Sequence, residues 1–179
     1  MNWILQTKRL RFRALNEEDL LPLRDILGDP EVMYAWEHGF SDEEIYRWID
    51  ENQRRYARDG YGYFAAVKAT SERLIGLMGL LAENTEKGSE PGLGYIVKKD
   101  CWGRGLATEG AGAWLEYGFS MLYAVRIVAE IRPENLPSRR VAERLGMKAA
   151  GSLVKQYRGK DMIHLLYALE KPDFYQRKK

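Results

Sequence analysis

The chain has few of the residues that build disulfides and metal centres. Among its 179 residues there are one cysteine and two histidines. Because Cys101 stands alone, no disulfide can form within the chain, and a reducing compartment is the natural expectation. Two histidines give little material for a metal site, so we expect no bound metal.

Long apolar stretches and an excess of one charge are also missing. No run approaches the roughly 18–20 apolar residues that span a bilayer, and the first residues lack the basic start and apolar run of a secretory signal. We therefore expect a cytoplasmic protein with no membrane partner. Lys and Arg number 28 against 26 acidic residues, so the charge balance gives no case for nucleic-acid binding.

What remains is the composition of an ordinary globular protein. The chain is 45% hydrophobic and 30% charged, and its length suits one domain with a full hydrophobic core. We expect a single domain over residues 1–179. Its basic end, about residues 172–179, is expected to be a solvated tail, and a nucleic-acid-binding arm is the alternative interpretation.

Segments with the two-residue apolar period of strands alternate along the chain with segments that have the 3.6-residue period of helices. This alternation predicts an α/β domain. Helix starts are expected at Asn16, an N-cap followed by acids, and at Ser41, which opens a capping box with Glu44. Glu83–Glu90 is polar without apolar periodicity and is expected to be a loop. The expected strands are 10–14, 63–68, 74–81, 92–97, 127–131, 149–156 and 161–169, and the expected helices are 16–27, 41–59, 107–123 and 137–145.

The most informative segment is Trp102–Glu109, which lies between the expected strand Gly94–Val97 and an expected helix. A glycine-rich turn from a strand into a helix lets the backbone approach an anion closely, and the free N–H groups of the first helical turn point at it. The turn therefore predicts an anion site, and Glu109 is expected to serve the helix dipole. Glycines at 110, 112 and 118 indicate the close approach of another backbone or a ligand.

A third segment, Asn135–Met147, completes an ordered set. Together with Gly94–Val97 and Trp102–Glu109, it resembles the GNAT superfamily of acetyl-CoA-dependent N-acetyltransferases, and within it the RimJ/RimL-like branch. Gln6–Arg13 and Leu74–Leu80 resemble that branch's opening strand and third strand. The resemblance extends over nearly the whole chain.

The resemblance implies a fold and a reaction. The fold would be a single GNAT-type α/β (α+β) domain with a mixed, mostly antiparallel, twisted sheet of about seven strands, helices on both faces and a splayed strand pair that forms a wedge for CoA. The reaction would move the acetyl group of acetyl-CoA to a primary amine, either a protein N-terminus or a small molecule, by direct attack in a ternary complex. Monomer and homodimer both stay open.

The resemblance also assigns residues to the cofactor. N–H groups around Gly103–Thr108 would cradle the CoA pyrophosphate, and peptide groups near Ile96 and Val97 would pair with pantetheine. A backbone N–H of the same strand would hold the oxyanion. The residues assigned to the turn are Trp102, Gly103, Arg104, Gly105, Leu106, Ala107 and Thr108.

Proton transfer to the leaving group is assigned to one residue. The tyrosine that protonates the CoA sulfur in many GNAT enzymes would fall at Ala142, so Ser138 becomes the candidate hydrogen-bond donor to that sulfur. Asn135 would contact pantetheine or order the loop. The alternative role for Ser138 is capping of its own helix.

The general base is not carried over by the resemblance. The RimJ/RimL-like branch often has a glutamate two residues before the Gly-Tyr pair of this strand, but here that position is Gly92. Glu37 and His38, just before the capped helix, remain as candidates for the base. An exposed loop histidine without a catalytic role is the alternative for His38. Because the tyrosine is missing as well, a catalytically inactive CoA-binding regulatory module stays as the alternative function.

Overall fold

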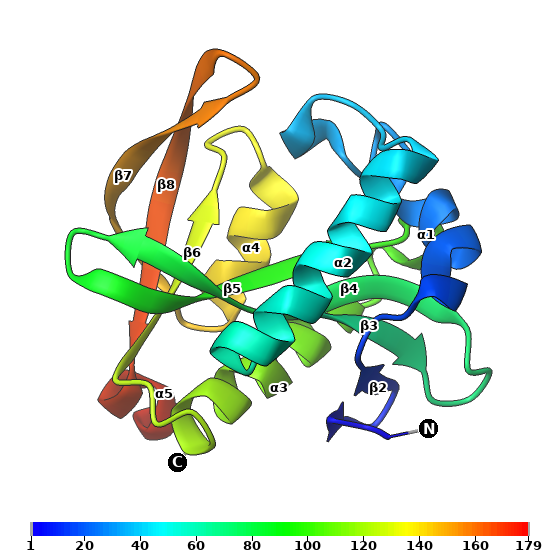
Figure 1. Ribbon diagram of the computed structural model, residues 1–179. Coiled ribbons are helices and arrows are strands. Elements are labelled where there is room, and N and C mark those ends of the chain that lie inside the picture. Colours follow the sequence, from blue (N-terminus) through cyan, green and yellow to red (C-terminus); the bar gives the residue numbers. More distant parts are fainter. Residues whose placement is uncertain (1, 179) are drawn as a thin grey trace. The chain divides into compact units, whose positions relative to one another are not determined.

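The structure is a computed structural model and describes residues 2–178. Figure 1 traces its elements along the chain. The strands are β1 (Leu5–Gln6), β2 (Leu10–Arg13), β3 (Tyr63–Lys68), β4 (Leu74–Thr85), β5 (Gly88–Val97), β6 (Arg126–Ile131), β7 (Lys148–Tyr157) and β8 (Lys160–Glu170). The helices are α1 (Leu20–Leu27), α2 (Asp42–Asp59), α3 (Leu106–Ser120), α4 (Leu136–Arg144) and α5 (Lys171–Gln176), with 3-10 turns at Glu17–Asp19, Tyr34–Trp36 and Lys99–Cys101. No helix among the described residues combines the length and apolar character needed to cross a membrane.

The eight strands are hydrogen-bonded neighbours in the order β1-β2-β3-β4-β5-β6-β8-β7. The predicted mixed α/β class is confirmed, and the sheet has one strand more than expected because the short β1 pairs with β2. The chain divides into two compact units, one of Met1–Leu81 with Gly94–Trp114 and the other of Ala82–Leu93 with Leu115–Lys179. Strands β4 and β5 and helix α3 each run from one unit into the other.

In the first unit, helices cover both faces of an antiparallel sheet formed by β1 to β4. Successive residues of a strand point to opposite faces. Tyr63 and Val67 of β3 therefore join the core that contains the apolar side chains of α1 and α2. Phe64, between them, stacks on Trp114 of α3 with ring centroids 4.8 Å apart.

Helix α3 approaches the sheet closely at Gly110. A Cβ at this position would lie 3.0 Å from Phe12 Cζ and 3.1 Å from Leu10 Cδ1, and it would overlap Met78 Sδ. A glycine allows this approach because it has no side chain. The atoms nearest to Gly110 belong to side chains of the sheet, and not to another backbone or a ligand as the sequence predicted.

The two predicted helix starts have the expected caps. Ser41 Oγ accepts the Glu44 N–H at 3.3 Å, and the Glu44 carboxylate accepts the Ser41 N–H at 2.8 Å. Helix α2 then runs to its predicted end at Gly60, whose φ is +81°. Asn16 caps the short 3-10 turn Glu17–Asp19, which leads directly into α1.

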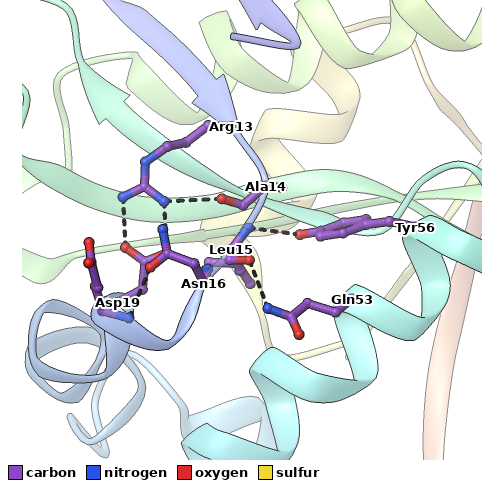
Figure 2. A network of polar contacts seen from close by, with 8 residues as sticks. Arg13, Ala14, Leu15, Asn16, Asp19, Gln53 and Tyr56 are labelled. Carbon is purple, nitrogen blue, oxygen red and sulfur yellow. Dashed lines mark hydrogen bonds and ion pairs between the residues drawn. The ribbon is translucent and has the colours of Figure 1, made fainter. Parts of the chain in front are cut away.

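Figure 2 shows a polar network that fixes the turn from β2 to α1. The two Nη atoms of Arg13 donate to the two carboxylate oxygens of Asp19 at 2.8 and 2.7 Å, and the Asn16 N–H donates to Asp19 Oδ2 at 3.0 Å. From α2, the Tyr56 hydroxyl accepts the Leu15 N–H at 3.4 Å. Burial raises the pKa of Tyr56, so its phenol stays protonated. The turn is thus held by both β2 and α2.

In the second unit, β6 is aligned with strands on both sides. It runs parallel to β5, with Val128 opposite Gly92, and antiparallel to β8, which pairs in turn with β7. Helix α4 contacts β6, and helix α5 contacts β8. The divergence of β5 from β6 that a CoA wedge requires stays a prediction.

The predicted loop over Glu83–Glu90 is wrong. Strands β4 and β5 form a hairpin there, and only Glu86 and Lys87 lie between them. Its charged side chains have partners within the unit: Arg126 Nη1 donates to both carboxylate oxygens of Glu90 at 3.1 and 3.0 Å. Such ion pairs replace the apolar alternation by which a strand is recognised in a sequence.

The end of the chain, expected to be a solvated tail, begins as the helix α5. Pro172 and Asp173 lie in its first turn, where proline and an acid are both favourable. Phe174 is buried and packs against Phe119 with ring centroids 5.0 Å apart. This aromatic contact anchors the helix, and the composition of the segment, which is basic, gives no sign of it.

Candidate functional site

The turn between β5 and α3 has the backbone that an anion site requires. Gly103 and Gly105 have φ values of +70° and +71°, in the left-handed region that favours glycine. A Cβ on Gly103 would meet nothing within 4 Å, so the turn is open at that point. The Glu109 N–H donates to the Gly105 carbonyl at 3.0 Å. The N–H groups of the first turn of α3 precede that bond, and helix geometry leaves them for an anion.

Thr7 and Arg9 hold this turn through Glu109. Glu109 Oε1 accepts from Thr7 Oγ1 at 2.6 Å and from the Arg9 N–H at 2.8 Å, and its Oε2 accepts from Arg9 Nε at 2.5 Å. Arg9 Nη1 also donates to the Arg104 carbonyl at 2.9 Å. The Arg9 side chain therefore connects the backbone of the turn to helix α3. Glu109 has this structural role in addition to the predicted one at the helix dipole.

We expect Glu109→Gln to destabilise the protein at neutral pH and to remove part of its acid sensitivity. Burial raises the pKa of Glu109, but the hydrogen bonds from Thr7 and Arg9 outweigh it and hold that pKa below its usual range. Such a carboxylate contributes stability above its unfolded-state pKa, and the contribution is lost as the pH falls through the folded-state pKa. The expected loss at pH 7 is ~1.5–3 kcal/mol, measured by urea denaturation.

Glu116→Gln is the matched control on the same helix. Glu116 is more than half exposed and pairs with Lys178 at 2.6 Å, so its replacement should change the free energy of unfolding little. If wild-type and Glu109→Gln proteins lose stability in parallel as the pH falls below about 4, the stabilising role of Glu109 is wrong.

Trp102 connects the turn to the end of β5. Its half-exposed indole donates from Nε1 to the Val97 carbonyl at 2.7 Å. The side chains of Ile96 and Val97 are buried, and the next residue, Lys98, donates its N–H to the Ile75 carbonyl at 2.8 Å. The strand end is therefore fixed from two sides. Pairing of Ile96 and Val97 with pantetheine stays a prediction.

The second unit places Asn135 and Ser138 at the start of α4. Asn135 is the N-cap, since its Oδ1 accepts the Ser138 N–H at 3.2 Å and its carbonyl accepts the Arg139 N–H at 3.0 Å. Of the two roles predicted for Asn135, this geometry supports ordering of the loop. Ser138 is a residue of the first helical turn and not its N-cap, so the capping alternative for Ser138 is wrong. Both side chains are half-buried.

Glu37 and His38 lie in the first unit, in the loop before α2. Glu37 has a left-handed φ of +66° and ends a 3-10 turn. His38 Nδ1 lies 2.9 Å from the Trp36 carbonyl, and His38 Nε2 lies 2.8 Å from Glu44 Oε1. The hydrogen bond from His38, followed by that from the Ser41 backbone, holds the pKa of Glu44 below its usual range. Nε2 fastens the loop to α2 and Nδ1 contacts the loop's own 3-10 turn, which favours a structural role for His38.

Residues 2–178 offer few side chains for metal binding or for thiol chemistry. No group of three or more His, Cys, Asp and Glu side chains among them is arranged to hold a metal ion. Cys101 is buried, and burial, followed by its contact with Asp100, raises the pKa of its thiol. A raised pKa disfavours the thiolate that a nucleophilic cysteine needs.

The family of the chain follows from residues 9–148, which match the family model of the acetyltransferase (GNAT) domain. The chain belongs to the GNAT acetyltransferase family. It is therefore an acetyl-CoA-dependent acetyltransferase, and the family predicted from the three segments is confirmed. The GNAT match includes Arg9, the turn Trp102–Thr108, Asn135 and Ser138, whereas β8 and α5 lie beyond it.

Two relatives and a solved structure are similar to this GNAT acetyltransferase. It is 35% identical to the uncharacterized protein YkkB of Bacillus subtilis (strain 168), over 84% of this chain and 88% of that protein. It is 30% identical to the uncharacterized N-acetyltransferase YnaD of the same organism, over 84% and 86% of the two chains. The crystal structure of an acetyltransferase (GNAT family) from Bacillus anthracis has the same fold, with a TM-score of 0.81, 24% identity and coverage of 94% and 98%.

Proposed function

We propose that this GNAT acetyltransferase moves the acetyl group of acetyl-CoA to a primary amine, which attacks the thioester directly in a ternary complex. The observation that carries the proposal is the turn with two left-handed glycines, open at Gly103 and braced by Arg9 and Glu109. Such a turn at a helix N-terminus suits the pyrophosphate of CoA. The backbone at Gly103 leaves room for that anion, because nothing lies within 4 Å of its Cβ position.

In this proposal each part of the cofactor has its own residues. Backbone N–H groups from Gly103 to Thr108 bind the pyrophosphate, and Arg104 adds positive charge beside it. Peptide groups of Ile96 and Val97 pair with the pantetheine amides, as an added strand would. One N–H of that strand also holds the oxyanion that forms when the amine attacks the thioester carbonyl.

Ser138→Ala should lower turnover by about tenfold, because we assign its hydroxyl to the CoA sulfur as the thiolate leaves. The affinity for acetyl-CoA should change little, and so should stability, since Asn135 and not Ser138 caps α4. Steady-state kinetics, calorimetric titration with acetyl-CoA and thermal unfolding measure the three quantities.

Asn135→Ala is the comparison for this helix start. It removes the cap and should cost about 1 kcal/mol of stability. If Ser138→Ala keeps wild-type turnover, or loses it only in proportion to a loss of folded protein, the donor role of Ser138 is wrong.

The acceptor is a protein N-terminus or a small primary amine, and an inactive CoA-binding regulatory module is the competing function. Release of CoA thiol from acetyl-CoA is measured with a panel of amines: peptides with a free N-terminus, amino acids, polyamines and amino sugars. Thiol release that depends on an amine supports the transferase. Tight acetyl-CoA binding without release on any amine would favour the module, and absence of acetyl-CoA binding would overturn both.

A further inference from the structure

Arg9 is fixed beside the turn Trp102–Thr108 through its backbone as well as its side chain. It lies between β1 and β2, where its N–H donates to Glu109 Oε1 at 2.8 Å and its carbonyl accepts the Ala69 N–H at 2.9 Å. Its guanidinium donates from Nε to Glu109 and from Nη1 to the Arg104 carbonyl. All of these residues belong to the first unit. Together these bonds leave Arg9 little freedom to move.

One nitrogen of the Arg9 guanidinium takes no part in these bonds. Nε and Nη1 are both bonded, and Nη2 has no hydrogen-bond partner within residues 2–178. A Cβ on Gly105 would lie 3.6 Å from Nη2, so this nitrogen stands at the second left-handed glycine of the turn. The Arg9 side chain is 46% exposed although two of its nitrogens are bonded. It therefore presents an accessible N–H donor in a fixed position beside Gly105.

This donor lies beside the backbone that suits an anion. Left-handed glycines such as Gly103 and Gly105 allow successive backbone N–H groups to converge on one anion. These N–H groups carry only partial charges, whereas the guanidinium of Arg9 carries a full one. Hydrogen bonds from a guanidinium to phosphate oxygens are shorter and stronger than bonds between neutral groups. Arg9 Nη2 therefore adds to the turn the cation that its backbone lacks.

Arg9 is better prepared for such a contact than Arg104, the arginine of the turn itself. Arg104 is exposed, and in residues 2–178 its guanidinium has no hydrogen bond or ion pair. A ligand that binds Arg104 must first order a long side chain, which costs conformational entropy. The bonds at Nε and Nη1 already hold the side chain of Arg9. The sequence points to Arg104 because it lies within the motif, but the structure favours Arg9.

Arg9 and Glu109 hold the turn together, but they act in opposite directions on an anion that binds there. Glu109 neutralises part of the charge of Arg9, because its carboxylate is bonded at Nε. Loss of the Arg9 charge weakens the binding of an anion beside Gly105, and loss of the Glu109 charge strengthens it. Loss of either side chain loosens the turn. A contact with the anion can therefore be separated from a purely structural role.

We propose that Arg9 binds the pyrophosphate of CoA through Nη2. The inference rests on the proposed function, which assigns the pyrophosphate to the turn, and it adds a cofactor-binding residue that lies 95 positions before Arg104 in the sequence. Arg9 then has two tasks. Its Nε and Nη1 hold the turn, and its Nη2 holds the anion that the turn binds.

Arg9→Gln should lower the affinity for acetyl-CoA by at least about tenfold, measured by calorimetric titration. Lys8→Gln is the control for charge alone. It removes a cation from the neighbouring, exposed residue and should keep the wild-type affinity. Glu109→Gln is the control for the structural role, because it weakens the same contact between Arg9 and α3 but removes a negative charge. It should bind acetyl-CoA at least as tightly as the wild type.

Arg9→Lys separates the charge from the hydrogen bonds. It keeps the cation but loses the planar guanidinium that bonds Glu109 and the Arg104 carbonyl together. In thermal unfolding it should lose stability as Arg9→Gln does. Its affinity for acetyl-CoA should fall by only about threefold, because a lysine still places a point charge beside the anion. Affinity should thus follow the charge, and stability should follow the hydrogen bonds.

Dephospho-CoA, which lacks the 3′-phosphate of CoA, tests which phosphate Arg9 contacts. Titration of wild-type and Arg9→Gln proteins with CoA and with dephospho-CoA should give the same loss of affinity for both ligands. A loss with CoA alone would assign Arg9 to the 3′-phosphate and overturn the contact with the pyrophosphate.

Three results would show that Arg9 does not bind the cofactor and would leave the proposed function standing. They are wild-type affinity of Arg9→Gln, equal losses in Arg9→Gln and Glu109→Gln, and equal losses in Arg9→Gln and Lys8→Gln. If Arg9→Gln does not fold, Arg9→Lys decides: near wild-type affinity supports the contact, and a loss of about tenfold or more overturns it. If the wild type binds no acetyl-CoA, the proposed function fails and the inference fails with it.

Discussion

Gly105→Glu should lower the affinity for acetyl-CoA by at least about 10²-fold, measured by calorimetric titration. Gly105 has a φ of +71°, which costs a residue with a side chain about 1–2 kcal/mol. The new carboxylate would also stand among the N–H groups assigned to the pyrophosphate. Like charges about 4 Å apart repel by about 4 kcal/mol at an effective dielectric constant of 20, which exceeds the ~2.7 kcal/mol of a hundredfold change.

Gly159→Glu is the matched control, because it makes the same change at a similar backbone angle. Gly159 has a φ of +75° in the turn between β7 and β8, and a Cβ there would meet nothing within 4 Å. Strain alone would affect both variants alike, so this control should bind acetyl-CoA as the wild type does. Equal affinity of wild-type and Gly105→Glu proteins would mean that the pyrophosphate lies elsewhere.

Features determined by neighbouring residues were predictable from the sequence. The capping box of Ser41 with Glu44 depends on residues three positions apart, and Gly60 ends the helix by its own conformation. The anion turn is local in the same sense, since its two left-handed glycines and the helix start lie within a few residues of one another. These signals need no knowledge of the tertiary structure.

Features determined by distant residues were not predictable. Arg9 bonds to Glu109 across 100 positions, and nothing in the segment around Arg9 indicates that it braces a turn. The β4–β5 hairpin was taken for a loop because its polar side chains find charged partners far along the chain, as Glu83 does with Lys155 across 72 positions.

Asp19→Ala should destabilise the protein by about 3–5 kcal/mol, because it leaves the Arg13 charge buried without its partner. The side chains of Asp19 and Arg13 are 3% and 15% exposed, and two hydrogen bonds of 2.8 and 2.7 Å join them (Figure 2). Asp19 Oδ2 also accepts the N–H of Asn16, the N-cap of the 3-10 turn before α1, and so completes its capping box. Removal of the carboxylate thus breaks the ion pair and the capping box together. Urea denaturation followed by circular dichroism measures the loss.

The pair of Arg24 with Asp42 separates burial from pairing in this prediction. It has the same two residue types and also two hydrogen bonds, donated by Arg24 Nε and Nη2 at 2.8 and 2.5 Å, but both side chains are about half exposed. Water solvates either partner when the other is removed, so Asp42→Ala should cost far less than Asp19→Ala. If Asp19→Ala lowers the free energy of unfolding no more than Asp42→Ala does, other groups compensate the charge of the desolvated Arg13. The difference between the two variants therefore measures what burial adds to an ion pair that fixes the start of α1.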